Sequence, residues 1–183
     1  MTRSRWLIIL FCLGIVSLSG GTGVTVASMV DPETSNTNDF QAWTSSVWTQ
    51  TSQEEFETGV ADQVDTAASS GNVILAKEMS LYVESGTMAS QVLDTGHSGS
   101  RWDGLFWDST LPAGTGITLE VRASDTVFAK DTPPGTLPWT SVGATSPVTD
   151  SLPSGRYIQW RATLTTSDPI ATPTLSEVRV YHY

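Results

Sequence analysis

The residue types best suited to ligand chemistry occur in three segments that alternate apolar and polar residues, 117–124, 155–169 and 175–183. If Arg161 lies across from Glu120 or Arg122 on paired strands, the polar positions of these segments form a patch of rings and donors. A sugar could bind there, because a ring stacks on its apolar face while Arg and Gln donate to its hydroxyls. The alternative interpretation is a solvated face with cross-strand ion pairs. The candidate ligand residues are Tyr157, Gln159, Arg161, Arg122 and Arg179.

Acidic residues offer a second kind of site, a structural calcium site. Asp62 and Asp65 lie near the start of the predicted domain, and Glu177 lies near its end. Calcium takes six to eight oxygen ligands and often holds a long loop in place. The alternative interpretation is a solvated acidic loop. A closed transition-metal site is excluded, because two isolated histidines and one cysteine within the N-terminal apolar run do not supply its ligands.

Catalytic motifs are not recognisable in the sequence. Nucleophilic hydrolysis needs Ser or Cys beside His and an orienting carboxylate, but His97 lies in a Gly/Ser turn and His182 at the C-terminal edge. A glycosidase needs two carboxylates on either side of a sugar, and the spacing singles out no pair among the 19 acidic residues. We therefore expect no catalytic residues, no enzymatic activity and no cofactor other than the calcium considered above.

Period-two hydrophobicity defines the elements that must position these residues. The clearest strand lies within 155–169, where Ile158, Trp160, Ala162 and Leu164 alternate with polar residues. The segment 117–124 repeats the pattern, and 175–183 places Val178 and Val180 on one side. We expect Trp102, Trp107, Trp139 and Trp160 in the core, and Trp43 and Trp48 exposed.

The rest of the chain also indicates short strands separated by turns. We expect an extended edge or loop over 48–60 with Phe56 inserted, strands over 71–76, 79–83, 86–94 and 101–108, and a bulge at Gly104. Residues 131–138, with three prolines and a glycine, predict a long surface loop. Eight or nine strands in one unit without a long helix predict an all-β protein, a two-sheet antiparallel β-sandwich of the jelly-roll type.

The N-terminus is typical of an exported protein. Arg3 and Arg5 precede the apolar run 6–18, which is shorter than the ~20 residues needed to cross a bilayer. We expect residues 1–27 to form a signal peptide, with a retained membrane anchor as the alternative. Residues 28–47 predict a flexible Ser/Thr/Asn-rich spacer, or a strand donated to a neighbouring subunit in self-assembly. The domain then spans 48–183.

Composition limits the class of partner. Charged residues make up 15% of the chain, and the net charge of −10 would repel the phosphates of nucleic acids. We therefore expect no nucleic-acid partner. Neutral glycans, surface proteins and divalent cations remain as candidates.

Several motifs in order carry a resemblance over about residues 48–183. They include Leu93-Asp-Thr-Gly96, Val121-Arg-Ala-Ser-Asp125 and Leu152-Pro-Ser-Gly-Arg-Tyr-Ile-Gln-Trp160. This order resembles a jelly-roll module, similar to galactose-binding and discoidin-like domains, of secreted and surface proteins of bacteria and archaea. The resemblance implies a binding or structural unit, usually one of several in a longer chain, whereas this sequence has one copy.

These observations lead to two functional expectations. The first is a non-catalytic, secreted or cell-surface protein that acts as an adhesive or structural component, with a surface protein or a second copy as partner. The second is a carbohydrate-binding module that recognises a cell-surface or extracellular glycan.

Overall fold

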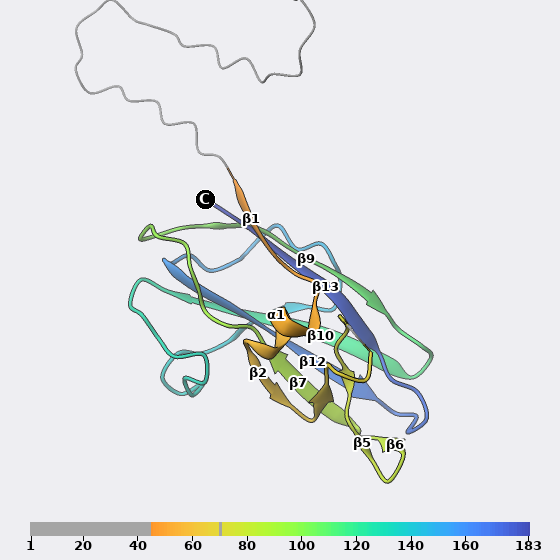
Figure 1. The fold of residues 1–183 in the computed structure, drawn as a ribbon. Helices are drawn as coiled ribbons and strands as arrows, with labels where there is room; N and C mark the ends of the chain where they lie inside the picture. The colour runs from red at the N-terminus through yellow and green to blue at the C-terminus, as the bar shows by residue number, and fades with distance from the viewer. Residues whose placement is uncertain (1–44, 70) are drawn as a thin grey trace, which may run out of the picture. The chain divides into compact units, whose positions relative to one another are not determined.

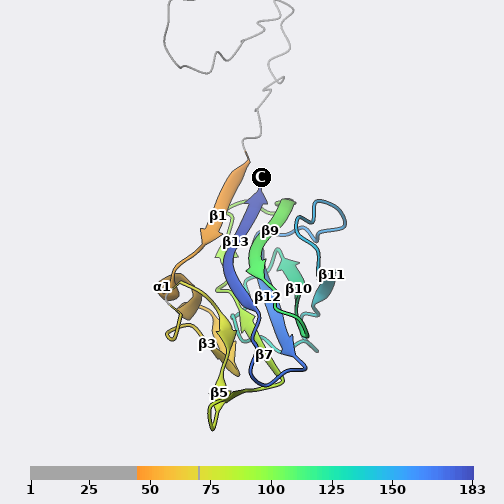
Figure 2. The same cartoon turned by 90° about the vertical axis from the view of Figure 1, so that its right-hand side faces the viewer.

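The computed structural model describes residues 45–69 and 71–183, and the predicted leader and most of the predicted spacer lie outside these ranges. The described part of the chain is all-β, with two main antiparallel sheets that face each other (Figures 1 and 2). The first sheet has the order β1 (Ser46–Gln50), β13 (Thr174–His182) and β9 (Trp102–Thr110). β1 therefore begins two residues before the predicted start of the domain.

The second sheet is larger and contains the predicted central strand. Its order is β11 (Thr140–Gly143), β10 (Thr115–Ser124), β12 (Tyr157–Thr166), β7 (Ser85–Ala89) and β2 (Val60–Asp62), and β8 (Leu93–Asp94) also pairs with β12. Two small pairs complete the architecture. They are β3 (Val64–Asp65) with β4 (Ile74–Leu75), and β5 (Lys77–Glu78) with β6 (Leu81–Tyr82).

The core confirms the alternation predicted for β12. The side chains of Ile158, Trp160, Ala162 and Leu164 are all 0% exposed, and they pack in one cluster with apolar residues of β9, β10 and β13. Burial of the larger of these side chains contributes about 1.5–3 kcal/mol each, which supplies the main driving force for folding in a sequence that has one cysteine. The two sheets are also joined by a buried hydrogen bond, which Trp160 Nε1 donates to Gln50 Oε1 at 2.9 Å.

The first sheet follows the predicted pattern of its strands. Val178 and Val180 of β13 are buried, and the β9–β13 register shifts where Tyr181 pairs with Gly104 and His182 pairs with Trp102. Asp103 is therefore an extra residue on β9. The bulge predicted at Gly104 is present beside that glycine.

The predicted edge or loop over 48–60 is instead the end of β1 followed by a short helix, α1 (Gln53–Glu57). A capping box begins it: Ser52 Oγ accepts from Glu55 N at 3.3 Å, and Ser52 N donates to Glu55 Oε2 at 2.9 Å. This arrangement satisfies two amides that a helix start leaves free. Phe56 is inserted as expected, with its ring centroid 6.3 Å from that of Trp160.

The prediction for the tryptophans is confirmed for three of the four that were expected in the core. Trp102, Trp107 and Trp160 are buried, whereas Trp139 is only half-buried. Trp48, expected to be exposed, is half-buried and packs against the core, and Trp43 lies outside the described residues. Over residues 45–69 and 71–183, no helix has the length and apolar character to span a bilayer.

Candidate functional site

The pairing of β10 with β12 brings three of the five candidate ligand residues together. Arg161 pairs with Glu120 and Arg122 with Gln159 on the polar side of the second sheet. Arg161 Nε donates to Glu120 Oε2 at 2.9 Å, which is the cross-strand pair expected if the two strands are neighbours. Both side chains of this pair are partly exposed.

Arg122 and Gln159 face away from the core, yet both side chains are buried, at 2% and 0% exposure. Arg122 Nε donates to Gln159 Oε1 at 2.8 Å, and its terminal nitrogens donate to the carbonyl oxygens of Lys130 (3.2 Å), Thr132 (2.7 Å) and Leu137 (3.4 Å). Gln159 Nε2 donates to Lys130 O at 2.9 Å. The loop between β10 and β11 therefore covers this part of the sheet.

Aromatic rings complete the surroundings of the arginines. The Trp139 ring centroid lies 4.2 Å from the guanidinium carbon of Arg122 and 4.6 Å from that of Arg161, and Phe128 lies 5.0 Å from Arg122. Cation–π contacts of this kind are stronger when they are shielded from water. Burial, and then the charge of Arg161, lower the pKa of the Arg122 guanidinium. Hydrogen bonds to the carbonyl oxygens and contacts with the aromatic rings offset the free-energy cost of burying the charge of Arg122.

A cavity of about 160 Å³ opens beside this cluster, and we call it the basic hollow. Its cationic lining residues are Arg122, Lys130 and Arg161, and its apolar ones include Val60, Ala89 and Trp139. Asp131 is its only acidic lining residue. Lys130 Nζ donates to Thr58 O at 2.7 Å and to Gly59 O at 2.8 Å, at the C-terminal end of α1.

Tyr157 and Arg179 lie apart from the basic hollow. Tyr157 is half-buried on β12, with the guanidinium carbon of Arg156 5.2 Å from its ring centroid. Arg179 belongs to β13 of the other sheet, so the structure does not bring it to the predicted patch. Its Nε lies 3.2 Å from Glu177 Oε1, a charge contact whose geometry makes no hydrogen bond.

The three residues proposed for calcium are not assembled either. Asp65 Oδ1 accepts from the backbone amides of Ala67 (2.8 Å) and Ala68 (2.9 Å), while Glu177 on β13 faces Arg179. Across the described ranges, no group of three or more His, Cys, Asp or Glu residues is arranged to hold a metal ion. Asp62, Asp65 and Glu177 therefore do not form a common site in this structure.

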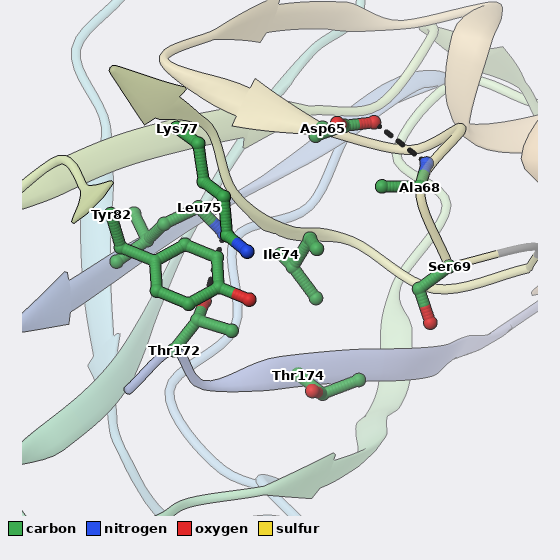
Figure 3. Close-up of a pocket in the computed structure, with 9 residues that line it drawn as sticks. All are labelled: Asp65, Ala68, Ser69, Ile74, Leu75, Lys77, Tyr82, Thr172 and Thr174. Atoms are coloured by element: carbon green, nitrogen blue, oxygen red, sulfur yellow. Dashed lines mark hydrogen bonds between the residues drawn. The ribbon is translucent and has the colours of Figure 1, made fainter. Parts of the chain in front are cut away.

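A second cavity, of about 360 Å³, lies between the small β3–β4 pair and the start of β13 (Figure 3). The side chains of Lys77 and Tyr82 lie close together there, with the Lys77 ammonium 4.6 Å from the Tyr82 ring centroid. Asp65 is turned toward Ala68 N, and Leu75 N donates to Thr172 Oγ1 at 3.0 Å. Much of its polar lining is thus already hydrogen-bonded within the protein.

Exposed apolar side chains gather at one end of the sandwich. Tyr82 N donates to Pro169 O at 2.8 Å and Ser167 N to Gly114 O at 2.9 Å, so three turns meet there. The β5–β6 hairpin at this end lies away from the C-terminus and the start of β1 (Figures 1 and 2). We define the apolar end as Met79, Leu81, Leu111 and Ile170, which are 97%, 48%, 48% and 78% exposed.

The apolar end was not predicted from the sequence. Met79 and Ser80 connect β5 to β6 with φ angles of 47° and 73°, a left-handed conformation for which Asn and Gly are the usual residues. A turn formed by Asn and Gly would have been recognisable, whereas Met-Ser was interpreted as part of a strand. The exposure of Met79 follows from this turn.

Comparison with known proteins gives no family assignment. No protein-family model and no curated protein matches the sequence. The function proposed below therefore depends on the geometry of the described residues and on the sequence features given above.

Proposed function

We propose that this chain is a non-catalytic, exported surface protein that acts as an adhesive or structural component through protein contacts. The observation that carries the proposal is the apolar end. Of the six large apolar side chains exposed in the described residues, four belong to this one end. Exposed apolar side chains that lie together, and not singly, mark contact surfaces of soluble proteins.

The hydrogen bonds already made on the polar side of the second sheet favour assembly over sugar binding. A sugar needs free donors and acceptors, but Arg122 already donates to Gln159 Oε1 and to the carbonyl oxygen of Thr132, and Gln159 Nε2 donates to the carbonyl oxygen of Lys130. Arg161 is paired with Glu120. These residues act mainly to hold the loop, and a glycan would have to displace existing hydrogen bonds.

Carbohydrate binding is the second candidate function, and the partly exposed rings of Tyr157 and Trp139 favour it. A glycan array probed with the full chain tests it. Binding that disappears in Tyr157→Ala and Arg161→Ala would establish the glycan function, whereas the assembly function predicts no specific glycan signal.

The proposal extends to features outside the described residues and to finer details of the fold. It includes a jelly-roll connection of the strands, export by residues 1–27 with cleavage or retention of the leader, and a role for the tail 28–47 in self-assembly. A structural calcium ion is a further proposal for the native protein. N-terminal sequencing of the exported chain tests cleavage, and a melting curve with added calcium tests the ion.

Self-association of the full chain is the central test. We expect the weight-average mass from sedimentation to rise with protein concentration, because the apolar end is withdrawn from water on association. A chain that stays monomeric at all accessible concentrations and binds a glycan would replace the first proposal with the second.

A further inference from the structure

Two surfaces of this molecule have opposite character. The apolar end joins apolar side chains with acidic neighbours, whereas the basic hollow joins apolar and aromatic side chains with cations. They lie on different parts of the unit: the hollow is at the Arg161–Ala89 pair of the sheet, and the apolar end is beyond the Thr165–Ser85 pair. A molecule therefore presents both surfaces at once.

The acidic residues of the apolar end are free to form a new ion pair. Glu78 and Glu84 line the same depression as Met79 and Leu81, and both are exposed. Within the part of the chain that the structure describes, neither glutamate is in an ion pair. Two unpaired carboxylates beside an apolar surface disfavour an anionic lipid bilayer as the partner and favour an apolar surface with basic neighbours.

The basic hollow offers such a surface through Lys130, which is exposed and in no ion pair among the described residues, whereas Arg122 is buried and Arg161 is paired with Glu120. The described residues include seven Lys and Arg residues, and three of them line this one cavity. The cavity volume of about 160 Å³ is suited to one long, unbranched side chain and not to a folded element. Met79, at the tip of a two-residue hairpin turn and 97% exposed, has this shape.

We propose that the apolar end of one copy docks on the basic hollow of a second copy. Met79 enters the hollow beside Trp139, where its thioether contacts the ring, and Glu78 lies near Lys130. This contact joins two different surfaces, so it is heterologous and repeats from copy to copy into a filament or a closed ring. The inference rests on the proposed assembly function and names the partner of the apolar end.

Disulfide cross-linking between two tagged full-length chains tests the contact directly. Both chains carry Cys12→Ser; one also carries Met79→Cys and the other Thr87→Cys, which lies in the lining of the hollow. We expect a mixed disulfide dimer under mild oxidation. The matched control replaces Met79→Cys with Val127→Cys, which is 69% exposed in another loop and should not cross-link to Thr87→Cys. Equal cross-linking of both pairs would overturn the proposal.

Charge reversal tests the same contact in solution. Glu78→Lys and Lys130→Glu should each weaken self-association at least about tenfold, and the double variant should recover part of the loss. Met79→Asp should weaken it at least as much. Lys130 also donates to the carbonyl oxygens of Thr58 and Gly59, so Lys130→Glu removes contacts within its own chain. If that variant is destabilised, Glu78→Lys and Met79→Asp still test the contact.

The outcomes separate this inference from the function on which it rests. Oligomers that persist unchanged in Glu78→Lys and Met79→Asp would overturn the docking contact and leave the assembly function standing. A wild-type chain that remains monomeric would overturn the docking contact and self-assembly, and would leave only adhesion to a different surface protein as the proposed function; a monomeric chain that also binds a glycan would overturn that function as well. Cross-linking of Met79→Cys to itself in preference to Thr87→Cys would replace the heterologous contact with a two-fold one, and so would also contradict the proposal.

Discussion

Arg122 is a buried cation. It holds the loop between β10 and β11 on the sheet by donating hydrogen bonds to neutral carbonyl oxygens of that loop. In Arg122→Met, the carbonyl oxygen of Thr132 and the Oε1 atom of Gln159 lose the donor that Arg122 supplies, whereas Lys130 O keeps its hydrogen bond from Gln159 Nε2. Unsatisfied buried polar groups cost more than the missing hydrogen bond itself, so we expect the free energy of unfolding to fall by about 2–4 kcal/mol. Urea denaturation, monitored by tryptophan fluorescence, measures this change in the free energy of unfolding.

Arg156→Met is the matched control. The Arg156 side chain is 38% exposed and pairs with the exposed Asp94, in water and not under a loop. An exposed ion pair contributes little to stability. We therefore expect this variant to unfold at nearly the same urea concentration as the wild type, and an effect as large as that of Arg122→Met would contradict the structural role given to Arg122.

Glu55 predicts a residue-level pH dependence. The amide of Thr51 donates to its carboxylate, and this hydrogen bond, followed by weaker ones, lowers the pKa of Glu55 below its ordinary value of 4.5. A lowered pKa stabilises the folded state above the ordinary value, and the contribution is lost as the pH falls through the folded pKa. The stability gap between wild type and Glu55→Gln should therefore shrink from about pH 6 to about pH 3 in urea titrations.

At the scale of elements, the approach of the β2–β3 turn to β7 makes Gly86 indispensable. A Cβ at this position would overlap the carbonyl oxygen of Gln63 and lie 2.8 Å from Val64 Cγ1. Because the obstacle is backbone, Gly86→Ala should lower the free energy of unfolding by at least about 2 kcal/mol. Gly135→Ala is the control, since its Cβ would meet nothing within 4 Å, and thermal melts compare the two.

The elements differ in how far the sequence could predict them. β10, β12 and β13 were recognisable because their period-two pattern coincides with burial, as for Leu119, Trp160 and Val178. α1 was missed because five residues give too little periodicity, although Ser52 and Glu55 form a capping box that is visible in the sequence. A search for such short capping motifs would have found it.

The candidate site shows a different limit. Alternation correctly placed Arg122 and Gln159 on the side of the sheet away from the core. It contained no information on which loop covers that side, because this depends on contacts with Lys130, Thr132 and Leu137 that form only in the folded chain. Arg179 was grouped with them for the same reason, since the pattern of a strand does not specify its sheet.

At the scale of the whole molecule, β1 separates the folding unit from the tail that precedes it. β1 pairs with β13 along its five residues, and Gln50 accepts the buried hydrogen bond of Trp160. A chain that begins at residue 44 keeps these contacts, whereas a chain that begins at residue 51 loses them. We expect the first to match the full chain in urea denaturation and the second to lose more than about 3 kcal/mol.

The same truncation distinguishes two ways of assembling the protein. If the apolar end docks on the basic hollow, the chain that begins at residue 44 retains both surfaces and should self-associate in sedimentation as the full chain does. If a donated strand from the tail makes the contact, this chain should be monomeric although its stability is unchanged. Because stability and association are measured on the same variant, loss of association alone would place the contact in residues 1–43 and not in the sandwich.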